Sequence, residues 1–537
     1  MTERSRRASA AAVCVLLAVI HTWPLALNPA RHSRNDNGDA LLNEWIMAWI
    51  AHQLPRDPLH LFEANIFYPA HDTLAFSEPL IVPALMGAPL AWAGASPVLV
   101  HNLVLIAGFA LTAFAGWWLI YEWTGHWTAG LLTGSTFAFN THTLSRLAHV
   151  QGVHLYGLIL CLLAADRLVA GGRARDAWLL AFSMVLLAYT SGYLVVFASV
   201  MLGVVVLTRA GEWWHRVVPA MSRFAAAGVV AAVAIVPVYL PYRRVAREQH
   251  MMRSLDNVRQ YSATLTGYIA SAGRIDFATW SARFFDRPID AFFPGFAAVA
   301  LAIAAIVFAF RQPRLRPRVL MLVVLAAAGV VLSLGTATPI YGWLFHIFPP
   351  MQGLRAAARF GNLFILATAV LGGIGLAAWS PRTWIAVTLV VLANAESLRA
   401  PIGYRDFTGI PRIYRLLAEE PGRVVLVEQP FYPRQAAFEN APYVLNSTAH
   451  WRPLMNGYSG YTPASYNDYA GAFWYFPADW AIQAMKDAGV THVMVHLSRF
   501  GPERGEEIIE KLRTRRDMEL LAAGSGGIRL YRLIRSP

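Results

Sequence analysis

Long apolar runs recur along the chain and are separated by short polar or basic stretches. Runs of about 15–24 residues with almost no charge are typical of membrane-spanning helices. We therefore predict a polytopic α-helical membrane protein with about 11 transmembrane helices. The predicted spans lie near 8–28, 98–121, 127–141, 153–171, 177–190, 192–208, 222–241, 294–311, 318–336, 357–379 and 382–397.

The apolar run 79–97 is treated differently, because prolines at 79, 83 and 89 interrupt it. We interpret it as an interfacial or re-entrant helix. With eleven spans and a cytoplasmic N-terminus, most arginine-rich stretches fall on the cytoplasmic side, as the positive-inside rule requires. This orientation places the loops 29–97 and 242–293 and the tail from 398 on the outer face.

The tail has a different pattern from the rest of the chain. Short β-prone runs at 423–429, 491–497 and 528–534 alternate with amphipathic helical stretches. This alternation predicts a small extracytoplasmic α/β domain. The predicted domains are therefore a transmembrane domain at 1–397, including both outer loops, and an α/β domain at 398–537.

Composition agrees with a membrane protein rather than a soluble one. Of the 537 residues, 56% are hydrophobic and only 14% are charged, whereas soluble domains carry nearer a quarter. The net charge is +13. Because most arginines flank predicted spans, we assign this charge to membrane orientation and anionic lipid, and we expect no nucleic acid partner.

The first outer loop combines acids with an amphipathic helix. Asp36 and Asp39 stand at the start of a stretch in which Leu41, Trp45 and Trp49 recur at helical spacing. Carboxylates are favoured at a helix N-terminus, so N-capping explains one acid. It does not explain two, and structured outer loops often carry function.

Several segments resemble a known superfamily. They are GDALLNEWIMAW, LFEANIFYP, LAFSEP, QYSATL and GLRAAARFGNLF. Together with the loop layout, they resemble an uncharacterised bacterial branch of the GT-C membrane glycosyltransferases. The resemblance implies transfer of a sugar from a polyprenyl-phosphate donor to a glycan, lipid or protein acceptor on the outer face of the plasma membrane.

Such a transfer needs a base and a cationic partner for phosphate. A carboxylate accepts the proton of the attacking hydroxyl, and Asp39, then Asp36, is our candidate. Arginine binds the leaving phosphate. Outer segments should be poor in arginine, yet Arg355 and Arg359 stand four residues apart before the tenth span, so we expect them to share one helical face. Arg253 and Arg259 stand in the second outer loop. These four arginines are the predicted donor-phosphate ligands.

Other residues complete the expected site. We expect substrate contacts from Asn43, Glu78, His149, Gln151 and Tyr261. His142, Arg146 and His149 would share one face if their segment were helical. A divalent cation, Mg or Mn, is left open as a cofactor. Adjacent Asp166 and Arg167 are expected to pair.

Two alternative functions remain at this point. One is a transporter or flippase of lipid-linked sugars, although the predicted spans are almost free of charge at mid-depth. The other is a non-catalytic assembly factor whose outer tail binds partners.

Overall fold

A computed structural model describes residues 2–34, 37–250, 254–286 and 290–534. The predicted site residues Asp36 and Arg253 lie outside these described residues. The chain forms two compact units. The first unit comprises Met1–Pro29, Asn102–Tyr239 and Met252–Gly403, and the second comprises Ala30–His101, Leu240–Met251 and Tyr404–Pro537.

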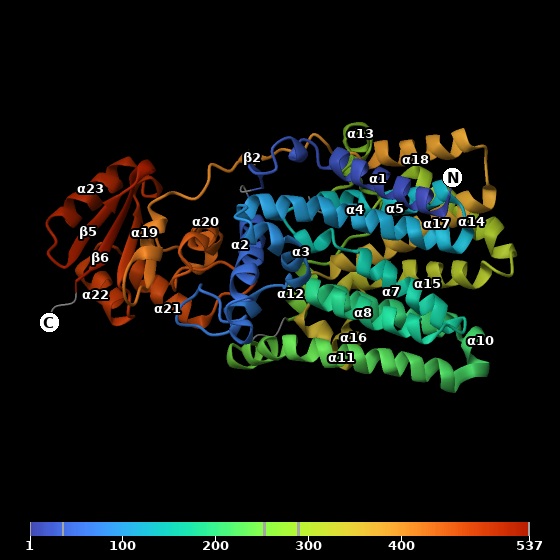
Figure 1. Cartoon of the computed structure of the whole chain (residues 1–537), viewed down its shortest axis with the longest axis horizontal. Helices are drawn as coiled ribbons and strands as arrows, with labels where there is room; N and C mark the ends of the chain where they lie inside the picture. The colour runs from blue at the N-terminus through green and yellow to red at the C-terminus, as the bar shows by residue number, and fades with distance from the viewer. Residues whose placement is uncertain (1, 35–36, 251–253, 287–289, 535–537) are drawn as a thin grey trace. The chain divides into compact units, whose positions relative to one another are not determined.

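The first unit is built from helices (Figure 1). Its helices, two of which extend past its boundary, are α1 Glu3–His21, α4 Pro97–Thr124, α5 Trp127–Ala138, α6 Thr141–Leu144, α7 Tyr156–Val169, α8 Ala174–Thr190, α9 Gly192–Thr208, α10 Ala210–Trp213, α11 Val217–Glu248, α12 Leu255–Gln260, α13 Arg274–Thr279, α14 Phe296–Phe308, α15 Arg316–Ser333, α16 Pro339–Ile347, α17 Gly361–Trp379 and α18 Thr383–Ser397. Each of the eleven predicted spans contains a helix, whereas α16 was not predicted.

Within the described part of the chain, five helices are long and apolar enough to cross a membrane. They are Pro97–Thr124, Val150–Val169, Ala210–Glu248, Arg316–Ser333 and Ala357–Trp379. Shorter apolar helices occupy four further regions. The count of eleven spans therefore stays a prediction. Large apolar side chains such as Leu207 and Val233 are more than 70% exposed, as expected where a surface faces lipid.

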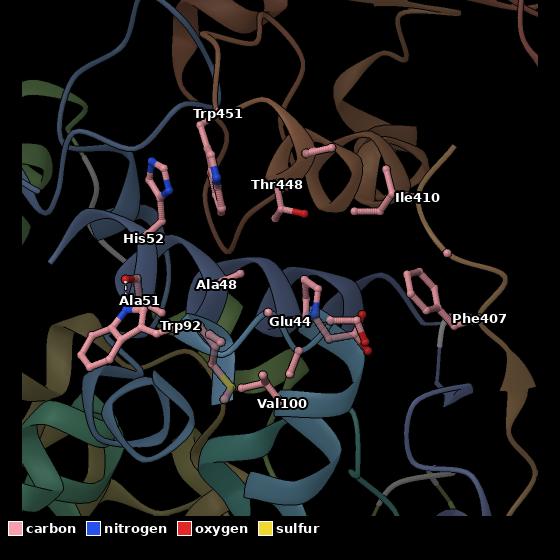
Figure 2. Close-up of a pocket in the computed structure, with 18 of the residues that line it drawn as sticks. Glu44, Ala48, Ala51, His52, Trp92, Val100, Phe407, Ile410, Thr448 and Trp451 are labelled. Carbon is pink, nitrogen blue, oxygen red and sulfur yellow. Dashed lines mark hydrogen bonds between the residues drawn. The ribbon is translucent and has the colours of Figure 1, made fainter. Parts of the chain in front are cut away.

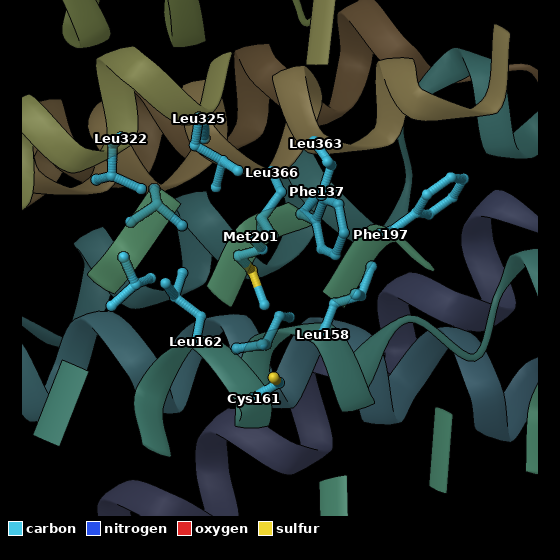
Figure 3. Packing of buried hydrophobic residues seen from close by; sticks show 14 of the residues in the cluster. Phe137, Leu158, Cys161, Leu162, Phe197, Met201, Leu322, Leu325, Leu363 and Leu366 are labelled. Carbon is cyan, nitrogen blue, oxygen red and sulfur yellow. The ribbon is translucent and has the colours of Figure 1, made fainter. Parts of the chain in front are cut away.

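The core of the first unit lies around α17, which packs against α5, α14 and α15. Figure 3 shows Leu363 and Leu366 of α17 close to Leu322 and Leu325 of α15 and to Met201 of α9. Glycine allows the closest approach, because a Cβ at Gly375 would collide with the carbonyl oxygen of Leu301. Small residues at helix contacts are typical of membrane bundles.

Charged residues in the first unit are paired where they are buried. Asp166 of α7 accepts hydrogen bonds from Arg209, at 2.5 Å, and from Arg318, at 2.9 and 3.0 Å. The expected pairing of Asp166 with its neighbour Arg167 is therefore wrong. On a helix, adjacent side chains point about 100° apart, and Arg167 instead contacts Glu122 and Asp176.

The second unit combines the first outer loop with the C-terminal region. Its helices are α2 Gly38–Gln53, α3 Ile81–Trp92, α19 Tyr414–Glu419, α20 Ala441–Asn446, α21 Ala464–Phe473, α22 Asp479–Asp487 and α23 Pro502–Arg513. A two-residue strand β1 (His32–Ser33) pairs antiparallel with β2 (Arg405–Asp406). Sequence-distant segments thus fold together within this unit.

A four-stranded mixed sheet forms in the C-terminal region, in the order β3-β4-β6-β5. Its strands are β3 Leu426–Gln429, β4 His492–His496, β5 Met518–Ala523 and β6 Ile528–Leu533. β3 pairs parallel with β4, and the other pairs are antiparallel. β3, β4 and β6 lie within the three predicted β-prone runs, and β5 was not predicted.

Candidate functional site

Asp39 lies in the first turn of α2. The side chain of Asn37 caps this helix by accepting a hydrogen bond from the Asp39 amide, at 2.9 Å. Capping is therefore supplied by Asn37, and the Asp39 carboxylate is not needed for it. One Asp39 oxygen accepts a hydrogen bond from the hydroxyl of Tyr458, at 2.6 Å, which fixes the orientation of the carboxylate.

The other acids and amides predicted in the first outer loop lie in different settings. Asn43 is buried on α2, while Glu78 is half-buried in the segment before α3. Asp72, which was not predicted as a site residue, is buried and binds Arg244 through two hydrogen bonds of 2.8 and 2.9 Å. Arg244 of the second outer loop therefore neutralises a protein carboxylate.

The two arginines predicted to share a helical face do not do so. Arg355 precedes the short helical turn Ala357–Phe360 that contains Arg359, so this prediction is wrong. The reason is Tyr193, whose hydroxyl accepts hydrogen bonds from the backbone N–H groups of Arg355 and Ala356, both at 2.9 Å. These bonds replace helical ones and hold residues 355–356 in an extended conformation.

Tyrosine rings support both guanidinium groups. Arg355 lies over the ring of Tyr261, at 4.7 Å, and Arg359 lies over the ring of Tyr193, at 4.5 Å. Cation–π contacts of this kind orient a guanidinium without neutralising it. Arg259, by contrast, is exposed on α12.

Arg359 lines a small cavity of about 40 Å³ in the first unit. His142, Arg146, His149, Gln151, Tyr193 and Asn362 line it as well. We call it the arginine pocket. It brings together three predicted residues, Arg359, His149 and Gln151, with three that the prediction missed, Arg146, Tyr193 and Asn362. Its volume suits a few water molecules or one small polar group.

Arg146 is a buried cation whose charge is incompletely compensated among the described residues. Its side chain is 13% exposed, and its ion pair with Asp290 is 3.4 Å long. Its Nε–H has no hydrogen-bond partner among the described residues. Burial and the nearby Arg359 lower the pKa of Arg146 to about 10. A buried guanidinium with one long ion pair favours an anion beside it.

A metal ion is not supported by the described residues. Within that part of the chain, no three His, Cys, Asp or Glu side chains come together in a group that could hold one. His142 and His149 both line the arginine pocket.

Comparison with known proteins identifies the fold. No protein-family model and no curated protein sequence matches the chain. Among solved structures, the arabinofuranosyltransferase AftD from Mycobacteria matches this whole chain with a TM-score of 0.61 and 16% identity. The match covers 40% of AftD, so the chain spans less than half of that protein's length. ArnT from Cupriavidus metallidurans, bound to undecaprenyl phosphate, matches over 100% of this chain and 99% of its own, with a TM-score of 0.53 and 14% identity.

The chain has a GT-C fold. The resemblance drawn from the sequence is thus confirmed at the level of the fold. Proteins with this GT-C fold are integral membrane proteins, and the apolar helices of the first unit agree with membrane insertion.

Proposed function

We propose that the chain is a glycosyltransferase that moves a sugar from a polyprenyl-phosphate donor to an acceptor on the outer face of the plasma membrane. The observation that carries this proposal is the arginine pocket, where the guanidinium groups of Arg146 and Arg359 line one small cavity and Arg146 is buried with only one long ion pair among the described residues. A phosphate supplies two or more oxygens to such a pair. The GT-C fold and the undecaprenyl phosphate in the ArnT structure support a lipid-phosphate ligand.

The reaction divides between two sets of residues. Asp39, or Asp36 outside the described residues, accepts the proton of the acceptor hydroxyl as that oxygen attacks the anomeric carbon. The bond from the anomeric carbon to the phosphate oxygen breaks, and the phosphate leaves with the bonding electrons. Arg359 and Arg146 stabilise the negative charge on this phosphate, while Arg355 is a further candidate.

Binding of the lipid phosphate tests the proposal directly. The full chain in nanodiscs is titrated with undecaprenyl phosphate, and binding is followed by native mass spectrometry. We expect Arg359→Gln and Arg146→Gln to weaken binding by on the order of 30–100-fold, as loss of a charged hydrogen bond predicts. Arg259→Gln is the matched control, since Arg259 is exposed, and it should bind as the unchanged chain does.

Two outcomes would contradict this assignment. Equal binding of undecaprenol, which has no phosphate, would show that the lipid chain alone is recognised. Movement of the donor across the vesicle membrane without sugar transfer would favour a flippase. Transfer assays with EDTA and with added Mg²⁺ or Mn²⁺ would decide whether a divalent cation takes part.

A further inference from the structure

A large cavity lies in the second unit, and Asp39 is not among the residues that line it. Its volume is about 950 Å³. One face of α2 forms its floor through Glu44, Met47, Ala48, Ala51 and His52, which recur at helical spacing. Asp39 is five residues before Glu44, so it points about 140° away around the helix. Figure 2 shows this cavity, which we call the Glu44 cavity.

Glu44 is the first sign that the Glu44 cavity holds a ligand. This side chain is only 1% exposed. One carboxyl oxygen accepts a hydrogen bond from Ser33, at 3.0 Å, and the other has no partner among the described residues. A buried polar atom without a partner is costly. Burial raises the pKa of Glu44 to about 8, so at neutral pH the group is mostly a neutral carboxyl that can donate or accept hydrogen bonds.

Trp451 is the second sign. Its backbone φ is +56°, a conformation that bulky residues rarely adopt and that often marks a functional position. Its ring stacks on the imidazole of His52, with the ring centroids 4.2 Å apart. Figure 2 places Trp451 between His52 and Thr448, at the edge of the open space. The strained backbone thus presents an aromatic face to the cavity.

The remaining lining indicates the class of ligand. Trp92 and Phe407 add further aromatic surface, while Arg56 and Arg415 line the cavity with exposed side chains. Burial and Arg56 lower the pKa of His52 to about 4, so its imidazole is neutral. A lipid tail would leave the buried carboxyl of Glu44 unsatisfied. A polyhydroxyl ring meets aromatic faces with its C–H groups and polar groups with its hydroxyls.

We propose that the Glu44 cavity binds a carbohydrate unit, with Trp451 stacking on the sugar ring and Glu44 hydrogen-bonding to its hydroxyls. Identifying this sugar as part of the acceptor or product glycan rests on the proposed function. The binding itself does not rest on it. The acceptor class then becomes a glycan or a glycan-bearing molecule.

The test measures carbohydrate binding without requiring transfer. The full chain in nanodiscs is applied to an array of neutral and acidic oligosaccharides, and the best-bound member is titrated by tryptophan fluorescence. We expect binding to weaken at least about tenfold in Trp451→Ala and in Glu44→Ala. Trp451→Phe should bind better than Trp451→Ala, because it keeps an aromatic face. Glu510→Gln, whose side chain is 71% exposed on α23, should bind as the unchanged chain does.

Every other result of this test would refute one part of the inference. No array member bound, or equal binding by all variants that keep their thermal midpoint, would refute the carbohydrate site. Displacement of the array ligand by dihexanoyl phosphatidylcholine would assign the cavity to lipid. Sugar binding in the Glu44 cavity with no transfer activity would retain this inference while refuting the transferase. Transfer that is indifferent to Glu44→Ala and Trp451→Ala would retain the transferase and refute the identification of the bound sugar as part of the acceptor or product glycan.

Discussion

The two units carry opposite kinds of incompletely paired group. In the first unit, the arginine pocket buries a cation, Arg146, beside a second guanidinium in about 40 Å³. In the second unit, the Glu44 cavity buries an acid among aromatic side chains in about 950 Å³. The first arrangement selects a small anion, and the second selects a larger neutral ligand. Under the proposed function, this difference would let one chain recognise the two ends of a transfer reaction through separate chemistry.

The largest expected effect is at Asp39, because the proposed base lies in the second unit and the phosphate-binding arginines lie in the first. Asp39→Asn should reduce sugar transfer by about 10²–10⁴-fold, because a general base contributes that much. Binding of undecaprenyl phosphate should be unchanged, because the arginine pocket is intact. Transfer of labelled sugar and lipid binding are measured on the same preparation.

Asp36→Asn is the parallel variant for this test. If it abolishes transfer while Asp39→Asn does not, the base is Asp36. Full transfer in both variants would remove the base from this loop.

Much of the fold could be predicted from the sequence, because apolar runs mark helices locally. All eleven predicted regions contain helices. The strand β5, MELLAA, was missed because it consists of residues that favour helices and contains no β-branched or aromatic residue. The helix α16 was missed because it has only nine residues, too few to suggest a span.

The sites were predicted less completely, because they depend on contacts between distant segments. Arginine in an outer segment is a local anomaly, and it identified Arg359. Arg146 also stands in a predicted outer segment, so the same criterion would have identified Arg146. Glu44 was expected on a polar face of α2. In the structure Glu44 is buried, since helix α20 of the C-terminal region packs on α2. No local sequence pattern indicates a contact between segments so far apart in the chain.

A second prediction compares two buried cations within the first unit. Arg209 is well paired with Asp166 and Glu212, whereas Arg146 has one long ion pair. Asp166→Leu should destabilise the protein by about 3–5 kcal/mol, because it leaves buried arginines without their shared carboxylate. Arg146→Met should cost less than Asp166→Leu, because the ion pair that it breaks, with Asp290, is long at 3.4 Å.

The measurement is unfolding monitored by denaturant titration in detergent, with lipid binding as the second readout. Equal destabilisation by the two variants would mean that Arg146 holds the fold together. Arg146 would then be a structural residue and not a binding group for an anionic ligand.

The third prediction uses pH to test the burial of Glu44. Its pKa is about 8 in the folded protein and about 4.3 when unfolded. Below pH 4 both states are protonated. As pH rises toward 8, the unfolded state loses its proton first, so stability falls by on the order of a few kcal/mol and then levels off.

Glu44→Gln should abolish this part of the pH dependence. The variant should match the unchanged chain near pH 4.5 and be more stable at pH 8.5, as judged by the thermal midpoint at each pH. Glu510→Gln is the control, since the Glu510 side chain is 71% exposed. A Glu44→Gln variant that is less stable at pH 8.5 would show that the carboxylate is ionised and compensated.

The smallest expected effect concerns the hydrogen bond that orients Asp39. Tyr458→Phe removes the donor at 2.6 Å, and a hydrogen bond to a charged group contributes about 1.5–3 kcal/mol, or on the order of a tenfold to hundredfold loss of transfer. Tyr461→Phe is the matched control, since the Tyr461 hydroxyl donates to the backbone oxygen of Gln249. Gly38→Ala is an independent route, because its Cβ would lie 3.1 Å from the Tyr458 ring and would displace it. If Tyr458→Phe and Gly38→Ala both leave transfer unchanged while Asp39→Asn abolishes it, the acid of the second unit acts without this orientation. The negative charge of the Asp39 carboxylate, and not its fixed orientation, would then be what transfer requires of the second unit.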